Sequence, residues 1–251
     1  MKQIQTVLVC CGLLCLLPAA LAAGLPVPVY NVDHPTAGLL EHGEYLFTGR
    51  VGPESSILVG VRIGFKSVVQ IGTSFGVQKV FDRGDVDVND KIGFQLRLRL
   101  IEESLAPALA VGFDSQGRGF YREDEKRYDR KSPGFYLVLS KNYISPVGEF
   151  SLHGGMNYST EDRDDNDPNL FACGDWRLIE QLSLLLDVDT ALNDNVDGGN
   201  FGKGGIYMDG AIRLDYGESL TFMLIFRDLT GNFGLTSGVG RELEISYWDS
   251  F

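Results

Sequence analysis

The chain has 251 residues, of which 44% are hydrophobic and 22% are charged. This length allows one or two domains, and this composition is that of a chain that folds around a core rather than a disordered one. Acidic residues outnumber basic residues by 34 to 22, which gives a formal net charge of −12. A surface of this sign repels nucleic acid and anionic lipid headgroups, so no nucleic-acid partner is expected.

The first 22 residues have the pattern of a cleaved secretory signal peptide. Lys2 precedes an apolar run from Val7 to Leu17, and Ala20-Leu21-Ala22 offers a small-x-small cleavage site. The run is shorter than the roughly 20 residues that a membrane-spanning helix requires. We therefore expect an exported protein whose mature chain begins near Ala23.

Residues 23–43, between the signal and the first strand, are expected to be a periplasmic N-terminal segment or plug. Within them, Pro35 to His42 is expected to be a short periplasmic lead-in or plug. The predicted cleavage site also separates the cysteines of the chain. Three of the four cysteines leave with the signal, so Cys173 remains alone and cannot form an intrachain disulfide. The departing cysteines are Cys10, Cys11 and Cys15.

The rest of the chain alternates with a period of two residues, which is typical of β-strands. In "KIGFQLRLRLI" the apolar residues Phe94 and Leu96 fall on one face, and Gln95 and Arg97 fall on the other. Strands of about ten residues, the length that crosses a bilayer at a tilt, are predicted throughout. They lie near 44–51, 56–65, 67–78, 91–101, 106–114, 133–142, 147–158, 168–177, 181–190, 205–215, 219–228 and 239–250.

Connections between these strands alternate in length. Those after even-numbered strands are short, such as "YISPV" and "YGES", whereas most after odd-numbered strands are long and polar, such as "SQGRGFYREDEKRYDRKS". Outer-membrane barrels have this asymmetry between periplasmic turns and external loops, and a β-sandwich has no reason to show it. We therefore predict an all-β fold over residues 44–251: a single antiparallel transmembrane β-barrel of about 12 strands.

The polar faces of these strands carry charges of both signs, which a barrel encloses in its lumen. We interpret them as a hydrated ladder of arginines and carboxylates, with a selective diffusion path as the alternative. Small residues on the same faces, such as Gly72, leave room for long arginines. The predicted lumen-lining charges are Arg62, Arg97, Arg99, Asp187, Asp189, Asp209, Arg213, Asp215, Arg227, Glu242 and Glu244.

The last predicted strand, "RELEISYWDSF", ends on an aromatic residue. Leu243, Ile245 and Tyr247, with Phe251, are expected to face lipid and to form the signal read by the barrel-assembly machinery. Asp249 has the same parity, so we expect either that it lies at the periplasmic interface, where a charge costs little, or that the register of the strand slips near Trp248. Outer-membrane lipid and the assembly machinery are the expected partners.

Two stretches carry residue types used in chemistry, and neither predicts a metal or catalytic site. "DRDDNDPN" places Asp162, Asp164 and Asn166 as in a calcium loop, but it lacks the turn Gly and the distal Glu. His153 shares a strand face with Ser151, which is too short-range a pairing for a nucleophile and its base. The sequence contains no Walker loop, dinucleotide fingerprint, CxxC or HExxH, so no cofactor is expected.

Several stretches together resemble known barrel proteins. They are "HPTAGLLEHGEYLF", "RLRLIEESLAPALAVGFDSQGRGFY" and "SPGFYLVLSKNY" followed by "SLHGGMNYS". These are similar to a widespread, largely uncharacterised family of bacterial outer-membrane β-barrel proteins. They also resemble exopolysaccharide-associated outer-membrane barrels of Gram-negative bacteria, in which a "PA-AVG" strand and a later strand ending "SK" recur. The resemblance runs from Pro35 to Phe251 and implies an outer-membrane barrel without catalytic residues.

These patterns predict a non-enzymatic outer-membrane barrel with a structural or porin-like role, assisting the passage of small solutes or envelope polymers. Two alternatives stay open. One is a soluble exported β-sandwich that binds carbohydrate, and the other is a lipid-acting barrel enzyme that depends on His153.

Overall fold

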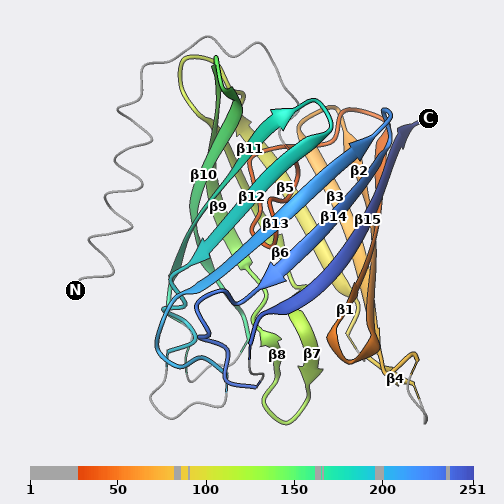
Figure 1. Cartoon of the computed structure of the whole chain (residues 1–251), viewed down its shortest axis with the longest axis vertical. Helices are drawn as coiled ribbons and strands as arrows, with labels where there is room; N and C mark the ends of the chain where they lie inside the picture. The colour runs from red at the N-terminus through yellow and green to blue at the C-terminus, as the bar shows by residue number, and fades with distance from the viewer. Residues whose placement is uncertain are drawn as a thin grey trace.

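The computed structural model describes residues 28–81, 86–89, 91–161, 165, 167–195, 201–235 and 238–251. The predicted signal peptide and the residues Asp162, Asp164 and Asn166 of the acidic loop lie outside this part of the chain. Within it, a 13-stranded antiparallel sheet closes on itself, and all of its strands except the two-residue β4 (Asp87–Val88) form a barrel of twelve (Figure 1). Closure is made by β1 (Glu44–Gly52), which pairs with β2 (Ser56–Phe65) on one side and with β15 (Gly240–Ser250) on the other.

The other barrel strands follow in chain order around the wall. They are β3 (Val69–Gln78), β5 (Gly93–Ile101), β6 (Ala108–Asp114), β9 (Gly134–Ser145), β10 (Gly148–Tyr158), β11 (Asn169–Ile179), β12 (Leu182–Asp189), β13 (Tyr207–Tyr216) and β14 (Leu220–Arg227). Each of the twelve predicted strands is present, with ends within three residues of the predicted ones. The alternative of a β-sandwich is wrong, because one closed sheet surrounds the interior instead of two sheets packing face to face.

The two ends of the barrel differ. The connections β2–β3, β5–β6, β9–β10, β11–β12 and β13–β14 are short and lie at the end where the chain terminates, at the top of Figure 1. We call this the short-turn end and the opposite one the long-loop end. At the long-loop end the structure adds elements that the sequence did not predict: a 3-10 turn η1 (Pro53–Ser55), strand β4, and a hairpin of β7 (Arg118–Arg122) and β8 (Arg127–Arg130).

The β7–β8 hairpin contains two tyrosines that pack together. Tyr121 and Tyr128 are both buried, and their ring centroids are 5.1 Å apart in an edge-to-face arrangement. The turn between the strands is charged, and Lys126 adopts a positive φ of 54°. Because charged residues dominate this stretch, its sequence reads as a loop.

The outward face of the barrel is apolar. Ile212, Leu224 and Leu243 are register neighbours on β13, β14 and β15, and they are 36%, 41% and 44% exposed. Similar exposed apolar residues continue around the wall: Phe47, Val59, Ile71, Phe94, Leu137, Met156, Trp176 and Leu184. An apolar surface of this extent marks a membrane or protein interaction site.

No helix in the described part of the chain is long and apolar enough to cross a membrane.

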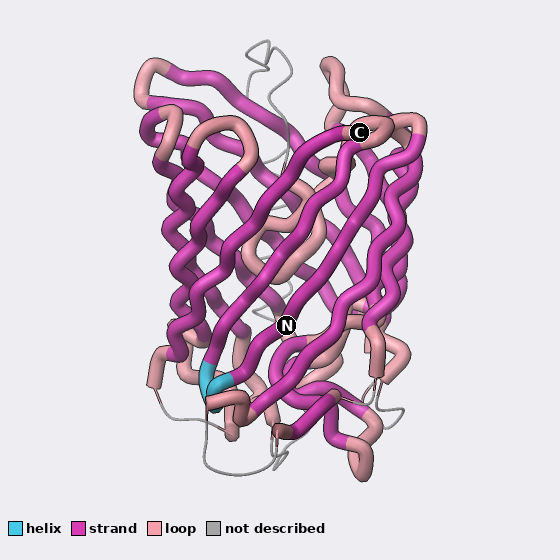
Figure 2. The backbone as a smooth tube through the Cα atoms, turned by 90° about the vertical axis from the view of Figure 1, so that its right-hand side faces the viewer, coloured by secondary structure: helices cyan, strands magenta, loops and turns pink. Residues whose placement is uncertain are grey.

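Residues 28–43, which we call the inner segment, fold as a loop inside the barrel (the red-orange trace in Figure 1; Figure 2 shows a loop between the front and back walls). The loop is held by two backbone hydrogen bonds, from Asn31 to His34 and from Thr36 to Val29, both at 3.1 Å. Its apolar residues join two small buried clusters of the wall. Val32 packs with Leu185, Ala211, Met223 and Ile225, and Ala37 packs with Ala108, Ala110, Tyr136, Val138 and Phe171.

Candidate functional site

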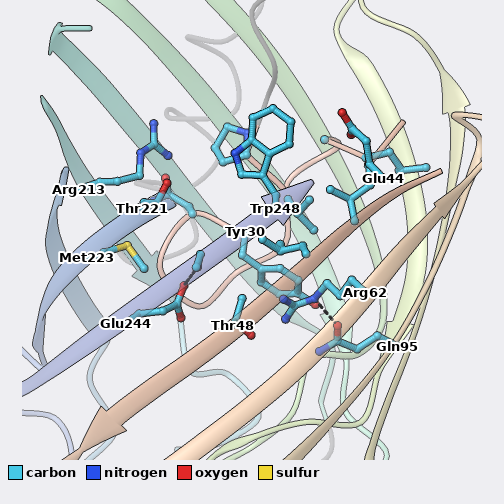
Figure 3. A pocket seen from close by; sticks show the side chains of 18 of the residues that line it. Tyr30, Glu44, Thr48, Arg62, Gln95, Arg213, Thr221, Met223, Glu244 and Trp248 are labelled. Carbon is cyan, nitrogen blue, oxygen red and sulfur yellow. Dashed lines mark hydrogen bonds between the residues drawn. The ribbon is translucent and has the colours of Figure 1, made fainter. Parts of the chain in front are cut away.

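The lumen is divided into a packed region toward the long-loop end and a cavity toward the short-turn end. The cavity has a volume of about 750 Å³ and is bordered by the inner segment and by inward side chains of the wall. Glu44 and Trp248 lie at its short-turn end (Figure 3). Glu218, in the β13–β14 connection, borders the same end. A volume of this size is that of a small-molecule site.

Asp33 lies at the centre of the packed region, at the deep end of the inner segment. Its carboxylate accepts hydrogen bonds from Arg50 at 2.8 Å, Arg118 at 2.8 Å and Arg227 at 2.9 Å, and Arg130 Nη1 is 3.8 Å away. Burial alone would raise the pKa of Asp33, but the arginines outweigh it and hold the pKa well below its usual range. Asp33 is therefore a buried, ionised carboxylate.

Three carboxylates of the wall complete this constellation. Glu244 pairs with Arg50 at 2.6 Å, Glu242 with Arg227 at 2.8 Å, and Asp209 with Arg130 at 2.6 Å. We call the eight residues the Asp33 cluster: Asp33, Arg50, Arg118, Arg130, Asp209, Arg227, Glu242 and Glu244. Four guanidinium groups face four carboxylates, so the cluster has no net charge.

A second set of contacts holds the turn of the inner segment. Asp187 accepts hydrogen bonds from the backbone N–H groups of Val32, Asp33 and His34, at 3.2, 2.6 and 3.1 Å. The His34 ring stacks on Phe171 and lies 3.2 Å from Asp189. Burial would lower the pKa of His34, but its interactions with Asp187 and Asp189 outweigh burial and raise it to about 10. His34 is therefore a cation between two carboxylates.

Ser140, His153 and Asp175 form a hydrogen-bonded row across β9, β10 and β11. His153 Nδ1 is 2.8 Å from Ser140 Oγ, and its Nε2 is 3.4 Å from Asp175. These residue types are those of a nucleophile, a base and the carboxylate that orients the base. However, Ser140 is fully buried, and its Oγ accepts the backbone N–H of Ala37 at 2.7 Å. In this conformation the row anchors the inner segment, which covers the hydroxyl.

Tyr30 of the inner segment lines the cavity (Figure 3). The guanidinium groups of Arg62 and Arg97 each lie 4.9 Å from the Tyr30 ring centroid, and Arg62 donates to Gln95 at 2.5 Å. Gly72 is required beside Arg62, because an added Cβ would come within 2.8 Å of the Arg62 side chain. Cation–π contacts thus fix the inner segment against β2 and β5.

Gln116 and Arg118 separate the cavity from the long-loop end. Both border the cavity, and both also border two small hollows beyond it, of about 30 and 40 Å³. Arg118 is held in this partition by Asp33, and its side chain is 17% exposed. The partition between the cavity and the two hollows therefore includes a contact between the β7–β8 hairpin and the inner segment.

No protein-family model matches the chain, and neither does any curated protein sequence. Among solved structures, KdgM porin is similar over 83% of this chain and 99% of that chain, with 8% sequence identity and a TM-score of 0.47. NanC porin is similar over 82% of this chain and 99% of that chain, with 8% identity and a TM-score of 0.48. These are likenesses of β-barrel architecture.

The predicted lumen charges lie in the interior but fall into different surroundings. Those bordering the cavity are Arg62, Arg99, Arg213, Asp215 and Glu244. Asp209, Arg227 and Glu242 belong to the Asp33 cluster, whereas Asp187 and Asp189 hold His34. Arg97 donates to the carbonyls of Val29 and Gly38 and to the Tyr136 hydroxyl. Five of these eleven charges contact the inner segment directly: Arg62, Arg97, Asp187, Asp189 and Arg227.

The predicted assembly residues lie on the outward face of β15 and beyond it. Leu243, Ile245 and Tyr247 are 44%, 43% and 41% exposed, and Phe251 is 84% exposed. Asp249 follows at the short-turn end, where it accepts a hydrogen bond from the Tyr247 hydroxyl at 2.9 Å.

Sequence reasoning missed the residues at the centre of the lumen. Asp33 and His34 lie in a segment without periodicity, and Arg118 and Arg130 lie in a stretch that reads as a loop. Arg50 had a signal, because it occupies the inward parity of β1 with Leu46 and Thr48. His153 was grouped with its strand neighbour Ser151, whereas its partners are Ser140 and Asp175 on adjacent strands.

Proposed function

We propose that the chain is a bacterial outer-membrane β-barrel with a porin-like role, exported through a cleaved signal peptide and oriented with its short-turn end in the periplasm. The closed sheet pairs every barrel strand on both sides, and the outward face is an apolar belt. Both properties suit a wall that faces lipid. The expected partners are outer-membrane lipid along this belt and the barrel-assembly machinery.

One observation supports passage through the barrel. The lumen is blocked by a segment outside the barrel strands: Gly43 of the inner segment lies at the short-turn end, and Pro28 borders the cavity. Such a segment can leave the lumen without breaking any strand pairing. We interpret this conformation as the closed state of a passage for small solutes. A role with envelope polymers is supported by the sequence resemblance alone.

Membrane insertion is tested by gel mobility. Detergent-extracted protein is compared before and after boiling, because a closed barrel resists unfolding by detergent and migrates differently until it is boiled. We expect a mobility shift and retention of the protein in membranes washed with high salt. An unshifted band from a protein released by salt would contradict insertion.

Passage is tested by conductance across planar bilayers. Wild-type protein is compared with a variant in which residues 29–39 are replaced by a flexible linker, and Arg122→Ala at the exposed side of the hairpin is the control. We expect the linker variant to show stable conductance that the wild type and the control lack. If the linker variant is inserted and heat-modifiable but does not conduct, the barrel is a filled structural element.

The Ser140–His153–Asp175 row keeps one alternative testable, that of a lipid-acting enzyme. That alternative requires ester or phospholipid hydrolysis by the purified protein and its loss in His153→Ala. Our proposal of a non-enzymatic barrel expects no hydrolysis in either protein, including in the linker variant, where Ser140 is uncovered.

A further inference from the structure

The Asp33 side chain occupies what is chemically a carboxylate-binding site. Its Oδ1 contacts Arg50, Arg118 and Arg227, and its Oδ2 contacts Arg227 and lies 3.8 Å from Arg130. Guanidinium groups match carboxylates geometrically and remain charged when buried. The recognition uses only the carboxylate group, so nothing in these contacts requires the carboxylate to belong to the chain itself.

The charge balance of the cluster depends on Asp33. The other three carboxylates, Asp209, Glu242 and Glu244, are on strands of the wall, whereas Asp33 is on the inner segment. If the inner segment left, four arginines would face three carboxylates, and one buried positive charge would be uncompensated. An uncompensated buried charge is strongly unfavourable. The same departure takes the His34 cation away from Asp187 and Asp189, so the imbalance is local to the four arginines. An anion in the place of the Asp33 carboxylate would remove that local imbalance.

The cluster borders empty space on two sides. Arg50 and Arg118 border the main cavity of about 750 Å³. Asp33, Arg118 and Arg130 border the hollow of about 30 Å³. An anion in the main cavity therefore reaches Arg50 and Arg118 while Asp33 is still in place.

We infer that Asp33 is an exchangeable internal ligand: a small solute bearing a carboxylate group competes with it for Arg50, Arg118, Arg130 and Arg227, and its binding frees the inner segment. This inference rests on the proposed function, because it names the class of solute that opens the same lumen. The Asp33 carboxylate stands in for the carboxylate of that solute.

Chemical rescue of Asp33→Ala tests the site without any measurement of passage. The variant lacks the carboxylate but keeps the four arginines, so formate or acetate is expected to restore its thermal stability in a saturable manner. Chloride at matched ionic strength is the anion control. Asp129→Ala is the protein control, because Asp129 pairs with the half-exposed Arg122 outside the cluster. Equal effects of formate and chloride on Asp33→Ala would overturn the inference.

A second measurement uses wild-type protein and does not depend on the folding of a variant. Cys173 is buried in the lumen and is the register partner of Asp187, which holds the turn of the inner segment. Release of the segment should therefore expose its thiol. We expect acetate to raise the rate of thiol labelling at Cys173 several-fold over chloride, read by peptide mass spectrometry. Labelling rates that are the same in both salts would contradict exchange.

The two proposals fail in different ways. If formate stabilises Asp33→Ala but the linker variant does not conduct, the carboxylate site is supported and passage through the barrel is contradicted. If the linker variant conducts, but formate does not rescue Asp33→Ala and acetate does not speed labelling of Cys173, passage is supported. Asp33 is then not an exchangeable ligand.

Discussion

Arg118 donates to the carboxylate of Asp33 at 2.8 Å, across 85 positions of the sequence. Arg118 begins the β7–β8 hairpin at the long-loop end, and Asp33 lies at the deep end of the inner segment. The contact joins the two elements that obstruct the lumen in the proposed closed state. Neither element belongs to the barrel wall, so the obstruction can change while the barrel stays closed.

This relationship predicts that Arg118→Ala increases conductance. The substitution removes a side chain that borders the cavity and both hollows, and it removes one arginine partner of Asp33. We expect more frequent openings in planar bilayers than for wild type. Arg122→Ala is the matched control, because it lies in the same hairpin but is half exposed and pairs with Asp129. Indistinguishable records for Arg118→Ala and wild type would place the obstruction elsewhere.

His34 predicts a pH dependence of stability. Its pKa is about 10 in the folded protein, against the ordinary histidine value of 6.5, so its stabilising charge is fully present below pH 6.5 and is lost as pH rises toward 10. The free energy of unfolding in detergent should therefore fall across this window. His34→Gln should lower it by roughly 3–5 kcal/mol at pH 6, because a buried pair loses one partner, and should flatten the pH profile.

The control for this prediction is His42→Gln, since His42 is exposed at the short-turn end. This variant should keep the wild-type slope. A wild-type profile that is flat between pH 6.5 and 10, or a slope that survives in His34→Gln, would show that His34 is not held as a cation between Asp187 and Asp189.

The apolar belt predicts that a charged substitution lowers the free energy of unfolding more at the middle of the bilayer than at its edge. Leu224 lies in the middle of β14 and faces outward between Ile212 and Leu243. Leu224→Arg should lower the free energy of unfolding from lipid vesicles by about 2–4 kcal/mol, whereas Tyr216→Arg, at the short-turn end of β13, should cost about 0–1 kcal/mol. Equal costs at the two positions would argue against a bilayer around the barrel.

The sequence predicted the wall of the barrel better than its contents, and the reason is physical. A wall strand is apolar on one face and polar on the other, so its period of two is a local signal that places even the weakly patterned β11. The inner segment is held by partners that are distant in the chain: Arg50 is 17 residues from Asp33, and Arg227 is 194 residues away. Such pairings across a lumen produce no periodicity.

The same reasoning explains the hairpin. Arg118 and Arg130 lie among charged residues typical of a solvated loop. They point inward to Asp33 and Asp209, which are distant in the chain. Charges on wall strands could be predicted to face the lumen, because side chains alternate between the two faces of a strand. The sequence did not show where the inner segment lies. It therefore could not show which charges contact that segment and which border open space.

Phe251 predicts a defect in assembly. Its backbone N–H donates to the Gly43 carbonyl at 3.2 Å, and its ring stacks on Tyr45 with centroids 6.4 Å apart, so it seals the seam between β15 and β1. We expect Phe251→Ala to lower the fraction of heat-modifiable protein in the outer membrane without reducing export, and Phe251→Trp to restore it. Wild-type assembly of Phe251→Ala would reject any role of this ring.

Refolding into pure lipid vesicles then separates two explanations of such a defect. If Phe251 is a signal read by the assembly machinery, Phe251→Ala should refold in vesicles as fast as wild type, because no machinery is present. If it acts only by sealing the seam, the variant should refold slowly in vesicles as well. Removing the partner ring in Tyr45→Ala provides the matched test, because it weakens the seam and leaves the exposed Phe251 side chain in place. A defect confined to cells and to Phe251→Ala is the result expected for a recognition signal.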